Sequence, residues 1–252
     1  MLSSTIIVCI ASFIAGFVDA IVGGGGLIQT PVLLMSFPSL PVASLLGTTK
    51  IPSFSGTAVS LYQYSKRVTI NWKLIIWIAA AAFAASMLGS MLVTIINNEL
   101  LKPIILIALA GVAVYTYSKK NFGQQEAQEI SFSNALIRGV TTGLLIGFYD
   151  GFIGPGTGSF LVLMFVGLLG NDFLHASAHA KTVNLATNIA SIIYFASTGN
   201  IIYELAVPMA LFNMTGGFIG SRLALLKGNT FIRIFFLLVV IGTIIRFAFD
   251  IF

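Results

Sequence analysis

Long apolar stretches recur along the whole sequence, and they constrain the fold more than any other feature. The runs from Leu2 to Val22, Leu74 to Ile96 and Leu205 to Leu226 each contain about 20 residues, the length that an α-helix needs to cross ~30 Å of hydrocarbon. Charged residues make up only 8% of the chain, against roughly 25% in an average soluble domain. We therefore expect an all-α integral membrane protein that crosses the bilayer several times.

The sequence also repeats itself with a shift of 131 positions. Under this shift, the run from Gly16 to Asp19 aligns with the run from Gly147 to Asp150, and Lys50 aligns with Lys181. Charged residues are so scarce that a chance match of both an Asp and a Lys is difficult to obtain. The pattern predicts two pseudo-symmetric repeats, residues 1–118 and 133–252, joined by a polar linker at 119–132.

Each repeat is predicted to contain a helix that breaks at a glycine-rich sequence. The breaks are Gly23 to Gly26 and Gly154 to Gly158, and the apolar segments that follow them are Leu27 to Phe37 and Ser159 to Leu169. Segments of about eleven residues cover only about half of the hydrocarbon thickness. Both breaks are therefore expected near the membrane midplane, where transporters place broken helices beside the substrate.

The distribution of basic residues predicts that the two repeats have opposite orientations in the membrane. Lys66, Arg67 and Lys73 flank one loop, whereas the equivalent loop from Thr198 to Tyr203 contains no Lys or Arg. Loops rich in basic residues face the cytoplasm. The two equivalent loops are thus expected on opposite sides of the membrane, as in an inverted repeat.

Lys50 and Lys181 are predicted to lie inside the membrane. A charged lysine there costs roughly 2.5 to 3.5 kcal/mol on insertion scales, so it requires a carboxylate, carbonyl groups, water or an anionic substrate as compensation. Asp19 and Asp150 are the candidate carboxylates. Each one is expected either to carry a coupling proton or to have a structural role, as a cap of the nearby glycine turn or in an ion pair with a lysine. The sequence leaves these roles open.

The candidate substrate site combines the two lysines with groups at and near the breaks. The amides and the positive dipole end at a helix N-terminus attract anions, and hydroxyl and amide side chains supply further donors. The other candidate residues are Gly24, Gly25, Gly26, Thr49, Gly156, Thr157, Gly158, Asn184 and Asn188. Helix packing and hydrogen bonds between helices are the alternative roles of these residues.

Other kinds of chemistry fit the sequence poorly. No strand precedes either glycine break, and no Gly-Lys-Ser or Gly-Lys-Thr ending follows, so a phosphate loop is not indicated. His175 and His179 lie four residues apart, but further metal ligands are lacking apart from Asp172. We expect no metal, no cofactor, no enzymatic activity and no nucleic-acid partner.

At these same residues the sequence resembles the TauE/SafE sulfite exporter family, also called the TSUP family. The runs that carry the resemblance are Gly16 to Gly26, Gly47 to Lys50, Gly147 to Gly158 and Ala180 to Leu185. The resemblance implies a multi-pass protein of the bacterial inner (plasma) membrane without a cofactor. It also implies the movement of small sulfur-containing anions such as sulfite, thiosulfate, sulfoacetate or other organosulfonates. The family often has Asn where Thr49 stands.

Together these observations lead us to expect a secondary transporter that exports a small anion. Its expected partners are this anion and the lipid bilayer, while homo-oligomer formation and the coupling ion stay open. The alternative is a passive anion channel for small oxyanions or carboxylates. A third alternative, a membrane scaffold without transport activity, leaves the two buried lysines without a ligand.

Overall fold

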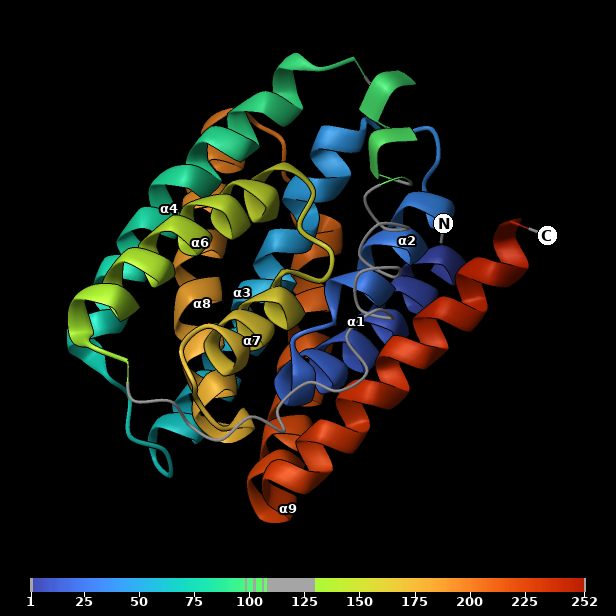
Figure 1. The fold of residues 1–252 in the computed structure, drawn as a ribbon. Coiled ribbons are helices and arrows are strands. Elements are labelled where there is room, and N and C mark those ends of the chain that lie inside the picture. Colours follow the sequence, from blue (N-terminus) through green and yellow to red (C-terminus); the bar gives the residue numbers. More distant parts are fainter. Residues whose placement is uncertain (1, 98, 102, 106, 108–129, 252) are drawn as a thin grey trace.

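The computed structural model describes residues 2–97, 99–101, 103–105, 107 and 130–251, and all of the elements in these ranges are helices (Figure 1). The first repeat contains α1 (Leu2–Val22), α2 (Gly26–Ser36), α3 (Val42–Ser65) and α4 (Trp72–Ile95). The second repeat contains α6 (Phe132–Phe152), α7 (Thr157–Gly167), α8 (Phe173–Ser197) and α9 (Tyr203–Ile251). Residues 119–129 of the predicted linker, Lys119 included, lie outside the described ranges, as does most of the helix expected from Leu100 to Ser118.

Three of the described helices are long and apolar enough to cross a membrane by length and composition, namely α1, α4 and the first part of α9. Their outer faces carry large apolar side chains that are exposed in the described structure. On α1, for example, Ile6, Ile7 and Ile10 are each about half exposed. Exposed apolar surface of this extent fits a lipid environment rather than water. The expectation of an all-helical membrane protein is confirmed.

The helix breaks lie where the glycines predict them. Between α1 and α2, Gly23 has φ 78°, and between α6 and α7, Gly154 and Gly156 have φ 89° and 84°. Such positive values strain any residue that has a side chain. The short helices α2 and α7 contain 11 residues each and begin one or two residues before the predicted segments. A further non-helical glycine, Gly228, divides α9 between the two helices predicted in that region.

The two repeats are interlaced rather than side by side. In each repeat the first helix packs mainly on the fourth described helix of the other repeat, so that α1 lies along α9 and α6 lies along α4 (Figure 1). Glycines allow the close approach. A side chain at Gly147 would overlap the backbone of Ala82, and one at the equivalent Gly16 would overlap the backbone of Asn213. Equivalent residues thus make equivalent contacts across the molecule.

The two loops with different basic content lie at opposite ends of α3. The hydroxyl of Ser44, in the first turn of α3, donates a hydrogen bond to Oδ1 of Asn200 in the α8–α9 loop (3.1 Å). Lys66 directly follows the last residue of this 24-residue helix, which is about 36 Å long at 1.5 Å per residue. This separation agrees with the inverted repeat expected from the sequence. The sidedness of the loops in the membrane stays a prediction.

Candidate functional site

The two glycine breaks lie against each other in the interior of the protein. The amide of Ser159 donates to the carbonyl of Gly23 (2.9 Å), and its hydroxyl donates to the carbonyl of Val22 (3.1 Å). A side chain at Gly158 would overlap the backbone of Gly23. Gly158, which the sequence suggested as a ligand-binding residue, therefore has a direct role in holding the two breaks together.

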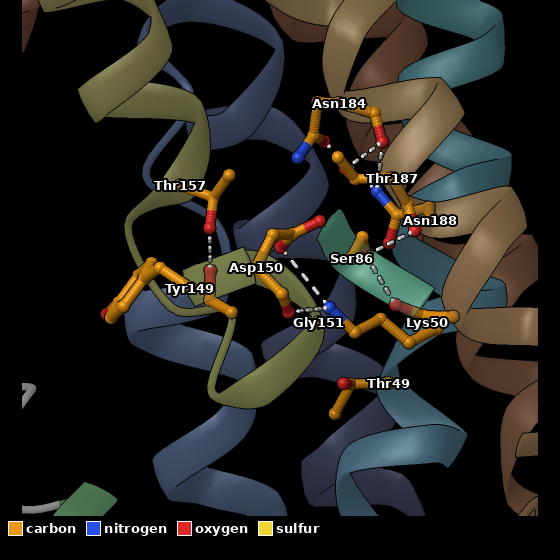
Figure 2. Close-up of polar contacts among 12 residues, drawn as sticks. Thr49, Lys50, Ser86, Tyr149, Asp150, Gly151, Thr157, Asn184, Thr187 and Asn188 are labelled. Atoms are coloured by element: carbon orange, nitrogen blue, oxygen red, sulfur yellow. Dashed lines mark hydrogen bonds and ion pairs between the residues drawn. The ribbon is translucent and has the colours of Figure 1, made fainter. Parts of the chain in front are cut away.

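Each buried lysine extends to the aspartate of the other repeat, and Figure 2 shows this contact for Lys50 and Asp150. Lys50 Nζ donates to the backbone carbonyl of Asp150 and lies 3.2 Å from Oδ1 of the same residue. Lys181 Nζ donates to the backbone carbonyl of Asp19 (2.8 Å). Both lysines are almost fully buried, at 4% and 3% exposure. The contacts are equivalent under the 131-residue shift, and each one joins the two repeats.

The surroundings of the two aspartates differ. Asp19 accepts a hydrogen bond at each carboxylate oxygen, from the amide of Gly25 (3.3 Å) at Oδ1 and from the hydroxyl of Thr57 (3.4 Å) at Oδ2. Asp150 faces Lys50 with Oδ1, but its buried Oδ2 has no hydrogen-bond partner among the described residues. The carboxylate of Asp150 therefore depends on a single cation.

The difference arises on α8, where Asn188 occupies the position equivalent to Thr57. Its Nδ2 donates to the backbone carbonyl (2.7 Å) and the side-chain Oδ1 (3.1 Å) of Asn184, one turn earlier. Thr57 lies 3.4 Å from Oδ1 of Asn184 as well. The two asparagines therefore lie close to the polar side chains of the first repeat, and Figure 2 shows them on the side of α8 that faces Asp150.

The other candidate residues form local contacts with the backbone. The Thr49 hydroxyl donates to the carbonyl of Leu46 (2.7 Å), and the Thr157 hydroxyl donates to the carbonyl of Gly154 (2.7 Å). At the breaks, the carbonyl of Gly24 accepts from the amide of Leu27 (3.1 Å), and a Cβ at Gly26 would lie 3.0 Å from Cα of Pro155. Gly25 lies against α1, where a side chain would overlap Ala15.

Sequence reasoning missed a buried pair of amide side chains. Asn213 Nδ2 on α9 donates to Oε1 of Gln29 on α2 (2.9 Å), and Gln29 Nε2 donates to the carbonyl of Thr49 on α3 (3.3 Å). Both amides are nearly inaccessible, at 3% and 2% exposure. The sequence does contain a signal for them. Asn213 and Gln29 are polar residues within apolar stretches, whereas the equivalent residues in the other repeat, Ala82 and Phe160, are apolar.

The two histidines have different partners. His175 Nδ1 lies 2.5 Å from Oδ2 of Asp172, and His179 Nε2 accepts a hydrogen bond from the amide of Asn71 (3.2 Å). Within the described part of the chain, no cluster of three His, Cys, Asp or Glu side chains is arranged to hold a metal ion. His179 instead connects the start of α8 to the α3–α4 loop.

Comparisons with known proteins place the chain in a family. Residues 8–247 match the family described as Sulfite exporter TauE/SafE. The chain is 36% identical to the "Probable membrane transporter protein ORF9" of a Sinorhizobium species, over 96% of this chain and 91% of the relative. It is 36% identical to a "Probable membrane transporter protein" of Haemophilus influenzae, over 90% and 88%.

A third relative is the "Probable membrane transporter protein YfcA" of Escherichia coli K12, which is 32% identical over 88% of this chain and 81% of its own length. No solved structure matches the chain. The family resemblance seen in the sequence is thus confirmed over nearly the full length, and the chain belongs to the TauE/SafE family of membrane transporters.

Proposed function

We propose that this membrane transporter is a secondary transporter, working in the export direction, for a small sulfur-containing anion. Sulfite, thiosulfate, sulfoacetate and other organosulfonates are the proposed substrates, and the bacterial inner membrane is the proposed location. The observation that carries the proposal is the pair of buried lysines beside the two helix breaks. Buried cations in a membrane mark ion and substrate pathways, and their symmetric positions match the central site of a transporter with repeats.

The contacts of the two repeats favour the start of α7 as the position of the anion. At the start of α2, the carboxylate of Asp19 already accepts a hydrogen bond from the Gly25 amide. At the start of α7, the Asp150 carboxylate faces Lys50 instead and makes no hydrogen bond to a backbone amide among the described residues. We therefore place the anion near Gly156 and Thr157, where helix amides and the dipole add to the charge of a lysine.

The remaining candidates have supporting roles in this proposal. Lys50 is bonded to one backbone carbonyl and one carboxylate oxygen, and an ammonium group has three N–H donors, so it can turn to an anion when the carboxylate is neutralised. Asn184 provides a neutral amide donor on the facing surface of α8, and Asn188 supports it by donating to its side-chain oxygen. Lys181 provides the second positive charge.

Thermal unfolding of the purified protein in detergent, with a panel of added anions, tests the proposal. A ligand present at 100 times its Kd adds about 2.7 kcal/mol of stability, so sulfite, thiosulfate or sulfoacetate is expected to raise Tm while chloride and acetate do not. Lys50→Met and Lys181→Met should reduce this shift by about half or more, since a tenfold weaker Kd leaves about 1.4 kcal/mol of the added stability. Lys66→Met removes an exposed lysine at the end of α3 and should keep it. An unchanged Tm with every sulfur-containing anion would contradict the proposed substrate class.

Flux measurements in proteoliposomes separate the transporter from the channel. A secondary transporter accumulates labelled anion against its gradient when an ion gradient is imposed. A channel carries the anion only down its electrochemical gradient, so a lack of accumulation despite measurable flux would favour the channel.

A further inference from the structure

Asp150 combines three properties that Asp19 does not share. Its side chain is only 3% exposed, its Oδ1 lies 3.2 Å from a cation, and its Oδ2 has no hydrogen-bond partner among the described residues. Buried carboxylate oxygens are normally hydrogen-bonded, so an orphaned one calls for an explanation. Asp19 is only partly buried and accepts hydrogen bonds at both oxygens.

We propose that Asp150, and not the equivalent Asp19, takes up the proton that accompanies the anion, with one proton bound for each anion. This inference rests on the proposed transport function. The proton comes from water and binds to Oδ2, where no existing hydrogen bond has to be broken first. No covalent bond of the anion changes, and the same proton returns to water when the anion is released. Because proton and anion move in the same direction, export coupled in this way is driven by the outward gradient of the anion.

Charge balance supports this stoichiometry. The buried site contains two lysines and two aspartates, so its formal charge is zero before the anion arrives. A monovalent anion adds a negative charge, and an uncompensated ion in a low-dielectric interior costs several kcal/mol. A proton on Asp150 restores neutrality. It also releases Lys50 from the carboxylate, so that an N–H of the ammonium becomes available to the anion.

The other groups around Asp150 cannot replace this proton acceptor. From α3 the facing charged group is Lys50, and from α1 it is Asp19, whose two oxygens are already bonded. On α6 itself, the Tyr149 hydroxyl donates to the carbonyl of Pro155 (2.7 Å).

The other elements packed against α6 add no further acceptor. On α8, Lys181 donates to the Asp19 carbonyl, and the two histidines lie near the start of that helix, where they bond to Asp172 and Asn71. The sequence of α7 contains no ionisable residue, and that of α4 contains only Lys73, in its first turn. Asp150 is thus the acidic group whose carboxylate is stabilised by Lys50 alone among the described residues. The anion and this carboxylate compete for the ammonium group of Lys50.

The test measures the Kd of a monovalent anion whose own charge does not change across the neutral pH range, such as methanesulfonate, at several pH values. Binding that is linked to one proton makes Kd rise about tenfold for each pH unit above the pKa of the proton acceptor in the free protein. Asp150→Asn mimics the protonated residue, so its Kd should be independent of pH. This variant should still exchange labelled anion but lose accumulation driven by a proton gradient.

Two controls complete the experiment. Asp19→Asn should keep the tenfold dependence, and wild-type protein in weak buffer with a pH indicator should take up one proton per anion bound. That second measurement does not depend on the folding of any variant. A pH-independent Kd in the wild type, or a dependence retained in Asp150→Asn, would overturn the proton assignment while leaving anion transport intact. If methanesulfonate does not bind the wild type at any pH, the proposed function itself fails, and the proton assignment fails with it.

Discussion

The crossed contact between Lys50 and Asp150 makes a quantitative prediction about stability. Their charged groups are 3.2 Å apart, which corresponds to an attraction of about 5 kcal/mol at an effective dielectric constant of about 20, before the desolvation of both charges is counted. Lys50→Met leaves the Asp150 carboxylate buried without a cation, so we expect a loss of about 3–5 kcal/mol in the free energy of unfolding. The double variant with Asp150→Asn removes both charges and should recover at least about 2 kcal/mol of that loss.

The measurement is a double-mutant cycle by equilibrium unfolding in mixed detergent micelles. The matched control is a second cycle that combines Lys50→Met with Asp19→Asn. No hydrogen bond or ion pair joins Asp19 to Lys50 in the described structure. The coupling energy in this second cycle should stay below about 0.5 kcal/mol. Equal coupling energies in the two cycles would refute the crossed pairing. So would a double variant with Asp150→Asn that is no more stable than Lys50→Met alone.

Three further predictions follow from the charges and the packing of the breaks. Single cysteines at Lys66 and Asn200 should react with impermeant reagents from opposite sides of the membrane, and labelling from the same side would remove the inverted repeat. Lys181→Met should weaken anion binding at least tenfold, about 1.4 kcal/mol. Lys181→Arg should restore only part of this affinity, because a planar guanidinium group does not replace the compact charge of an ammonium group. Unchanged affinity in Lys181→Met would exclude Lys181 from the anion site. Gly23→Ala should lower the free energy of unfolding by more than Gly199→Ala, because both glycines have positive φ but only Gly23 lacks space for a side chain. Equal losses would show that backbone strain at positive φ, and not the close contact with Gly158, decides the effect at Gly23.

The sequence predicted the helices and their breaks well, for identifiable physical reasons. A membrane leaves the backbone few alternatives to the helix, so apolar length alone placed α1 at its observed bounds. The breaks were visible because glycine is needed where φ is positive, as at Gly23 and Gly154. Because these signals are local, a single sequence is sufficient to find them.

The contacts inside the site could not be predicted in the same way. Asp19 and Asp150 were equally plausible partners for Lys50, because the choice depends on how the two repeats interlace. The hydrogen bond between Gln29 and Asn213 joins residues 184 positions apart, and one polar residue in an apolar helix does not indicate its partner. The unpaired oxygen of Asp150 could not be predicted either. No sequence pattern shows that Asn188, the equivalent of Thr57, donates to Asn184 and not to Asp150.

The crossed lysine contacts also impose an order on the synthesis of the protein. Lys50 precedes its partner by 100 positions, and Asp19 precedes Lys181 by 162. At about 5–20 residues per second, α3 is complete about 4–17 s before the ribosome has made Asp150. During this interval Lys50 lacks its partner from the second repeat. We therefore expect the first repeat to remain beside the insertion machinery until α6 has been made. Release of the nascent chain into the lipid is therefore expected to depend on the second repeat, and a chain that ends before α6 should be a substrate for membrane proteolysis.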